Sequence, residues 1–237
     1  MYILFLFPYL GDLIEGDARP QDAMGEAAAR WPKQHRSRRT LQRITRAALE
    51  LIAQNGVDGT TIGAIAGRAG SSVGSFYARF DGKNDFLVYL DQCIWETVER
   101  RWSTATADGL ADLPIDQLVR CLARLYADLD LVHQAARDAI GRALRGSGAG
   151  PSEAAVRIRA RVREDSVGLL LKKRDEIVHS NPVLAVETVC RTLETAVHRV
   201  EPILLKDLCS ALVVHLVGDR PSSPSFEASV EFFDIWS

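Results

Sequence analysis

From Thr40 onward, apolar residues recur every three or four positions, and the alternation typical of β-strands is scarce. This spacing predicts amphipathic helices, because residues three and four apart share one helix face. Glycine and proline mark the breaks, as at Asn55-Gly56, Asp81-Gly82 and the stretch GSGAGP over residues 146–151. The expected helices are about 40–55, 61–69, 72–80, 84–102, 114–144, 152–178, 182–200 and 203–217. We therefore predict an all-α fold.

Both ends of the chain lack this periodicity. Residues 1–33 begin with MYILFLFPYL, which has no positively charged start and is soon followed by acidic residues, unlike a signal peptide. We expect a disordered extension or, because Met24 lies shortly before the organised region, a mis-called start. Residues 219–237 are expected to form a C-terminal tail. No apolar run reaches the ~18 residues that a membrane span needs, so we expect no membrane partner and a cytoplasmic protein.

The expected helices 61–69 and 72–80 are short, and the tight turn Gly70-Ser71 joins them. Such a pair can hold its second helix steeply enough to enter a DNA major groove, which is about 12 Å wide. An apolar inner face must lock the pair onto a supporting helix. The residues that would form this face are Ile62, Ile65, Ala66, Phe76 and Phe80 against Leu41, Ile44 and Ala48. With Phe76 and Phe80 inward, the far side of the second helix carries Ser75, Ala78 and Arg79.

Two residues at the start of the second helix have alternative interpretations. Ser72 is either a helix cap alone or a cap that also contacts a phosphate or a base, because a groove-facing helix N-terminus presents free N–H groups. Val73 is either a core residue or a contact for a thymine methyl group.

The distribution of charge favours DNA more than the formal net charge of −2 does. No acidic residue occurs between Ala27 and Leu49, a stretch that holds seven Lys and Arg residues, including Arg38 and Arg39. Residues 33–95 carry nine basic and five acidic residues, a net of +4, which leaves −6 for the remainder. A basic run alone is usually a solvated surface, but beside a helix-turn-helix it predicts an arm that binds phosphates.

Residues 60–87 resemble the DNA-binding signature of the tetracycline-repressor-like (TetR) family of bacterial transcription regulators; they read TTIGAIAGRAGSSVGSFYARFDGKNDFL. The matching features are Thr61, the Gly70 turn, the Gly74-Ser75-Phe76-Tyr77 core, Phe80 and Lys83. Ser71 departs from the pattern, since the family usually has an apolar residue there. The resemblance implies that Thr61, Tyr77 and Lys83 contact phosphates, and that Ser72, Val73 and Ser75 face the groove.

The last two expected helices, about 182–217, have broad apolar faces. These faces are either ordinary core or, as the resemblance implies, the interface of a homodimer in which both helices pair with their mates. A two-fold dimer would present two recognition helices about one DNA turn apart, roughly 34–36 Å, and would read a palindromic operator.

An unknown small-molecule effector would lie among the helices between about Trp95 and Leu193. Trp102, Tyr126 and His133 are candidate ligand-binding residues, because each combines an apolar body with a polar tip, although each is also an ordinary core residue type. The arginines at positions 157, 159, 161 and 163 have acidic neighbours and are interpreted as a solvated face with i,i+4 pairs.

The sequence predicts no catalytic residue, cofactor or metal site. Residues 70–74, GSSVG, match the G-x-S-x-G hydrolase motif, but that motif requires a preceding strand, and helical periodicity precedes it here. We expect four regions: residues 1–33, a helix-turn-helix DNA-binding domain over 34–88, a helical effector-binding and dimerisation domain over 89–218, and the tail 219–237. The expected function is that of a ligand-responsive transcriptional repressor. The alternative is a small-molecule-binding or interaction protein without productive DNA binding.

Overall fold

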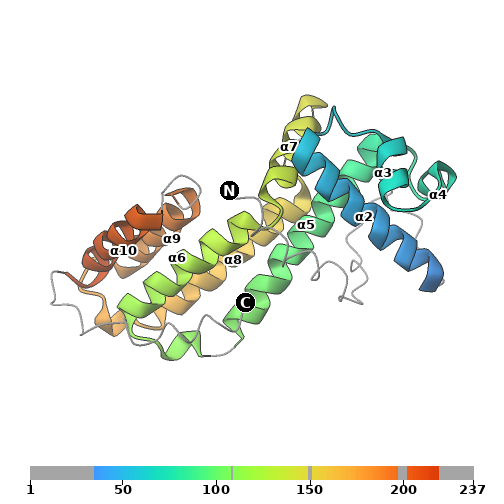
Figure 1. Ribbon diagram of the computed structural model, residues 1–237. Coiled ribbons are helices and arrows are strands. Elements are labelled where there is room, and N and C mark those ends of the chain that lie inside the picture. The colour runs from blue at the N-terminus through green and yellow to red at the C-terminus, as the bar shows by residue number, and fades with distance from the viewer. Residues whose placement is uncertain (1–34, 108, 149–150, 197–201, 219–237) are drawn as a thin grey trace. The chain divides into compact units, whose positions relative to one another are not determined.

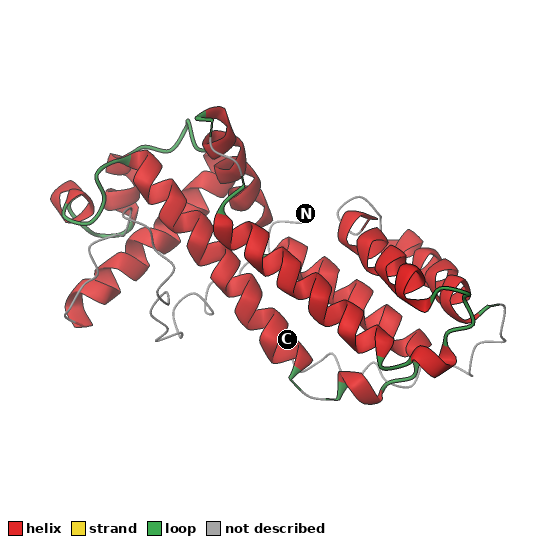
Figure 2. Cartoon of the chain, turned by 180° about the vertical axis from the view of Figure 1, so that it is seen from behind, coloured by secondary structure: helices red, strands yellow, loops and turns green. Residues whose placement is uncertain are grey.

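A computed structural model describes residues 35–107, 109–148, 151–196 and 202–218 of the chain (Figure 1). Helices and the turns between them account for all of these residues, and no strand occurs among them (Figure 2). The predicted all-α fold is confirmed. The expectations for residues 1–33 and 219–237 lie outside the described residues. Within the described ranges, no helix is long and apolar enough to cross a bilayer.

The helices group into two compact units, which divide after Val98, after Leu131 and after Arg157. The first unit contains α2 (His35–Asn55), α3 (Ile62–Arg68), α4 (Val73–Tyr77), residues 83–98 of α5 (Lys83–Thr106) and α7 (Gln134–Gly146). The first residues of α8 (Glu153–Leu171) also belong to it. This division groups helices by packing, so the expected domains 34–88 and 89–218 stay predictions.

In the first unit, α2 packs against α3 and α7, and α3 packs against α4 (Figure 1). The apolar periodicity of the sequence supplies the contacts, because the buried side chains are those that repeat at helical spacing. The fully buried members include Ile44, Ile52, Ile65, Phe76, Phe80, Phe86, Leu90 and Ile94. The predicted inner face is therefore largely correct, although Ile62 is only half-buried.

The second unit contains the end of α5, η2 (Leu110–Asp112), α6 (Ile115–Leu131), most of α8, η3 (Arg174–Glu176), α9 (Pro182–Ala196) and α10 (Pro202–Val217). Within it, α10 packs against α6 and α9 (Figure 1). The backbone N–H of Val178 donates to the carbonyl of Leu216 at 2.9 Å, which fastens the segment after η3 to the end of α10.

Several helix boundaries differ from the expected ones. His133 interrupts the periodic stretch 114–144, because its φ of 48° lies in the left-handed region, and α7 begins after it. Val132 and Ala136 are both buried, so the apolar spacing continues across the break and gives no sign of it. The long helix expected to end near Val178 ends at Leu171.

The expected cap of α5, Asn84 or Asp85, is wrong. The helix begins at Lys83, so both residues lie in its first turn. The carboxylate of Asp85 reaches back to accept the backbone N–H of Asp81 at 3.1 Å. An acidic residue in a first turn also interacts favourably with the positive end of the helix dipole.

Candidate nucleic-acid interface

Two adjacent threonines start α3 in different ways. Thr60 is buried, and its hydroxyl donates to the carbonyl of Gly56 at 2.7 Å, which fixes the loop after α2. Thr61 is exposed and is the N-cap, because its Oγ1 accepts the backbone N–H of Ala64 at 3.1 Å. The predicted position of Thr61 at the opening of this helix is confirmed, and its hydroxyl lies at the surface.

The turn between α3 and α4 depends on Gly70. Its φ of +56° lies in the left-handed region that glycine adopts without a steric penalty. The backbone N–H of Ser71 then donates to the carbonyl of Ala66 at 2.9 Å and closes the end of α3. Because this bond uses only the backbone of Ser71, the turn forms although its side chain departs from the TetR-like pattern.

Helix α4 has a polar N-terminus. Ser72 is its N-cap, with Oγ accepting the backbone N–H of Ser75 at 3.1 Å and lying 3.0 Å from the Ser75 hydroxyl. Val73 is 42% exposed, so it is not a core residue. Ser72, Val73 and the half-buried Ser75 therefore form one accessible group at the start of α4.

Phe76 anchors the inner face of α4 and is 0% exposed. Its ring lies 5.3 Å from that of Phe80 and 5.0 Å from that of Phe86, between centroids. Tyr77, the next residue, is 53% exposed and touches the cluster edge-on, with a centroid distance of 5.5 Å to Phe76. The aromatic cluster therefore fixes how α4 is rotated and leaves about half of Tyr77 accessible.

Three of the basic residues expected to contact DNA belong to the same unit as this helix. Arg38 and Arg39 are exposed in the first turns of α2. Lys83 is half-buried, and its ammonium donates to the carbonyl of Val57 at 2.6 Å. An ammonium has three donors, so this bond leaves others available to a phosphate. All eight residues expected to contact DNA thus belong to the first unit, and the roles assigned to them stay predictions.

Arg79 follows α4 and turns back toward α2. Its guanidinium donates to the Ser75 carbonyl and, through Nη2, to the Ser37 hydroxyl at 2.6 Å. Helical spacing predicts that Arg79 lies on the side of α4 opposite Phe76, but it predicts no partner for this side chain. No local signal identifies the contact, because the two residues are 42 positions apart.

Two of the three candidate effector residues lie together in the second unit. Trp102 is 1% exposed, and its ring centroid lies 6.2 Å from that of Tyr126. The Tyr126 hydroxyl lies 3.3 Å from Ser166 Oγ, and burial is the main cause that raises the pKa of Tyr126 well above its usual value. His133 belongs to the first unit and is not part of this pair.

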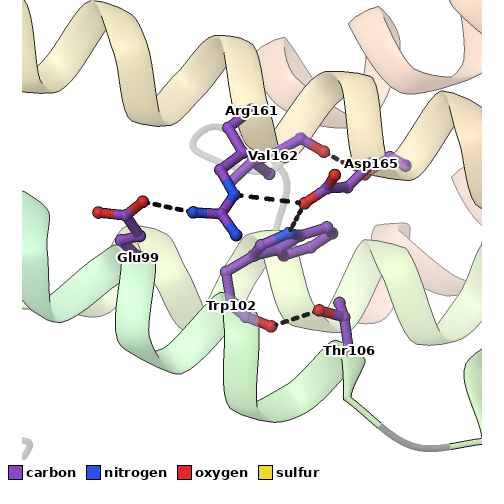
Figure 3. A network of polar contacts seen from close by, with 7 residues as sticks. Glu99, Trp102, Thr106, Arg161, Val162 and Asp165 are labelled. Carbon is purple, nitrogen blue, oxygen red and sulfur yellow. Dashed lines mark hydrogen bonds and ion pairs between the residues drawn. The ribbon is translucent and has the colours of Figure 1, made fainter.

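The polar end of Trp102 belongs to a network that sequence reasoning missed (Figure 3). Its indole N–H donates to Asp165 Oδ2 at 2.8 Å. Arg161 donates to Glu99 at 2.6 Å and lies 3.9 Å from Asp165, one i,i+4 pair of the kind expected along α8. The network ties the end of α5 to α8 and satisfies a buried donor. Among the described residues, no group of three or more His, Cys, Asp or Glu is placed to hold a metal ion.

The arrangement defines a class of protein: an all-α chain with a helix-turn-helix domain of the DNA-binding kind. Residues 44–90 match the family model of bacterial regulatory proteins, tetR family. The helix-turn-helix segment is therefore similar to that family, and the resemblance inferred from residues 60–87 is confirmed there. No curated protein matches the sequence.

Solved structures share the fold at low identity. A TetR-family transcriptional regulator from Mesorhizobium loti is 21% identical with a TM-score of 0.52, over 76% of this chain and 96% of that one. The regulator FadR from Bacillus subtilis, solved in complex with stearoyl-CoA, is 20% identical with a TM-score of 0.51, over 76% and 100%. The superantigen PfiT is 11% identical with a TM-score of 0.57, over 76% and 97%. These likenesses concern the fold.

Proposed function

We propose that this TetR-like protein is a homodimeric transcriptional repressor that a small-molecule effector releases from a palindromic DNA operator. The observation that carries the proposal is the division of α4 into two faces. Phe76 is sealed in the core, while Val73, at the margin of that buried face, and Tyr77, about 100° further round the helix, are exposed beside a polar N-terminus. A helix in a major groove needs both an anchored inner face and an accessible outer face.

The contacts with DNA divide by chemistry. Thr61, Tyr77 and Lys83 hold phosphates, and Arg38 and Arg39 add the charge attraction that supplies most sequence-independent affinity. Ser72, Val73 and Ser75 face the bases, where hydroxyls hydrogen-bond and valine methyls contact thymine methyls. The DNA-binding domain comprises residues 34–88, and the protein acts in the cytoplasm, where the DNA is.

The homodimer forms through α9 and α10. Large apolar side chains remain exposed on these two helices, although soluble chains rarely leave such groups clustered at the surface. They are Val183, Leu184, Leu204 and Val214. A second copy of the chain would bury them, and two-fold symmetry would place two copies of α4 along one face of DNA.

The effector binds within residues 89–218, and the pair formed by Trp102 and Tyr126 is the candidate contact. Support comes from the fold relative FadR, which was solved with stearoyl-CoA. Binding of an effector weakens binding of the operator only if the effector prefers a state in which the two DNA-binding domains are wrongly spaced.

A second candidate is a binding or interaction protein that does not bind DNA. One observation favours it: a superantigen is among the solved structures that share this fold, and fold alone does not determine function. A hydrolase is disfavoured, because Ser72 lies at the exposed start of α4 and follows α3, whereas the nucleophile of a G-x-S-x-G elbow follows a strand.

A mobility-shift titration separates the candidates, with DNA selected from a random-sequence pool by the wild-type protein or taken from upstream of its gene. The repressor predicts that Tyr77→Ala abolishes the shift while the dimer persists in sedimentation. A control, Tyr89→Phe, removes another hydroxyl from an aromatic residue of the first unit and is expected to keep the shift. Absence of any shift by wild type at low salt would favour the binding protein.

A further inference from the structure

Arg79 joins the end of the recognition helix to the start of α2. Its Nη2 donates to Ser37 Oγ at 2.6 Å and lies 3.4 Å from the Ser37 carbonyl oxygen, and its Nη1 donates to the Ser75 carbonyl. Ser37 lies in the first turn of α2, which begins at His35, and Arg38 and Arg39 follow it directly. The contact therefore connects the residue that follows the groove-facing helix to the residue that precedes the two arginines of α2.

The guanidinium of Arg79 is directed into the protein. Two of its nitrogens donate to protein oxygens, and the third, Nε, is buried with no hydrogen-bond acceptor among the described residues. Each terminal nitrogen carries two N–H groups, so these bonds leave one N–H on each, and a direct phosphate contact by Arg79 is the alternative that the test below separates.

Stabilisation of α2 alone does not explain the contact. A positive charge is favourable at the C-terminal end of a helix, as where Arg79 reaches the Ser75 carbonyl of α4, but is unfavourable near an N-terminal end. Ser37 lies near the N-terminal end of α2. The dipole of α2 therefore disfavours the position of the Arg79 charge beside Ser37. We infer that the bond serves to hold α2 and the end of α4 together.

We propose that Arg79 is a positioning residue for DNA binding: by holding Ser37, it keeps Arg38 and Arg39, which follow Ser37, in a fixed place relative to α4. Helix ends fray most readily, so a tie in the first turn of α2 acts where order is lost first. Ordering of these arginines before DNA arrives lowers the entropy cost of binding. This inference rests on the proposed function, because it assigns the bond between Arg79 and Ser37 a role in DNA binding.

The test measures how the dissociation constant for a duplex selected by the wild-type protein depends on salt. The variants are Ser37→Ala, Arg79→Gln, the double variant and Ser37→Thr, which keeps the hydroxyl. The log–log slope falls by about 0.9 for each phosphate that the protein no longer neutralises. A matched control, Arg174→Gln, removes one charge from η3 in the second unit.

We expect Ser37→Ala and Arg79→Gln to lower the slope by about 0.9 to 1.8, the value for one or two phosphates that are no longer neutralised. The double variant should lower it no further, and Ser37→Thr and Arg174→Gln should keep the wild-type slope. A lower slope in Arg79→Gln with an unchanged slope in Ser37→Ala would overturn the inference, because Arg79 would then bind a phosphate itself. Unchanged slopes in both would also overturn it.

Hydrogen exchange in the free protein provides a readout without DNA. Backbone amides of residues 39–44 should exchange faster in Ser37→Ala and Arg79→Gln than in wild type and Ser37→Thr, and equal rates would contradict the tie. A wild-type protein that selects no duplex would overturn the proposed function and the assigned role with it. Normal DNA binding with unaltered exchange and slopes would overturn only the role of Arg79.

Discussion

Phe76 and Tyr77 are neighbours in the chain and have opposite environments. Phe76 is fully buried among the rings of Phe80 and Phe86, whereas more than half of Tyr77 is exposed. Removal of a buried phenylalanine ring leaves a cavity and typically costs about 3–5 kcal/mol. Phe76→Ala should therefore lower the free energy of unfolding by about this amount in urea denaturation.

Tyr77→Ala is the matched comparison, since it truncates an aromatic residue of the same helix. It should change the unfolding free energy by about 1 kcal/mol or less, because an exposed ring loses little burial. Equal destabilisation by the two substitutions would contradict the assignment of an inner and an outer face to α4.

The two partners of the hydrogen bond between Trp102 and Asp165 differ in their exposure to water. Trp102 is buried, whereas the Asp165 side chain is 44% exposed and can be hydrated without its partner. Asp165→Ala leaves the indole N–H buried without its acceptor, which costs about 1–3 kcal/mol. Asp165→Asn keeps an acceptor at this position and should cost less. Thermal unfolding measures both, and equal losses of stability would contradict a stabilising role for the accepted hydrogen bond.

At the scale of one element, Ser72 is expected both to stabilise α4 as its cap and to face DNA. Ser72→Ala removes the cap and should cost about 1 kcal/mol, while Ser72→Asp keeps an acceptor for the Ser75 N–H. An aspartate at this place, however, would repel DNA phosphates. We therefore expect Ser72→Asp to unfold like wild type but to lose the mobility shift. Loss of stability in Ser72→Asp, or an undiminished shift, would contradict the two roles of Ser72.

Element type follows from the sequence more securely than element ends. Helical periodicity predicts the all-α fold because burial of one face dominates helix stability in proteins. Gly70 marks its turn because a positive φ needs glycine. The break at His133 cannot be predicted in this way, because a non-glycine residue adopts the left-handed conformation there while the buried pattern continues.

Contacts of the candidate functional residues can be predicted when the partners are close in the sequence, and not when they are distant. Thr61 and Ser72 are predictable, because each caps a helix through residues three positions further along the chain. The bonds of Arg79 to Ser37 and of Trp102 to Asp165 join residues 42 and 63 positions apart. Packing of whole helices decides such pairs, and no periodicity or spacing in one sequence encodes them.

At the scale of the whole molecule, the proposed homodimer depends on apolar side chains of α9 and α10. Leu184→Glu places a charge on a residue that is 55% exposed, so it should convert the dimer to a monomer with little effect on folding. Val156→Glu is the matched control, since Val156 is 56% exposed but lies on α8. Sedimentation velocity measures both, and a persistent dimer in Leu184→Glu would place the interface elsewhere.

The proposed repressor requires that α4, held by its aromatic face, reads DNA as one of a symmetric pair. Footprinting of the full chain on DNA selected from a random pool detects this arrangement. We expect two protected half-sites related by a palindrome, with centres about one helical turn or roughly 34–36 Å apart, and their loss in Tyr77→Ala. Absence of protection by the folded wild-type protein at low salt would contradict the proposal.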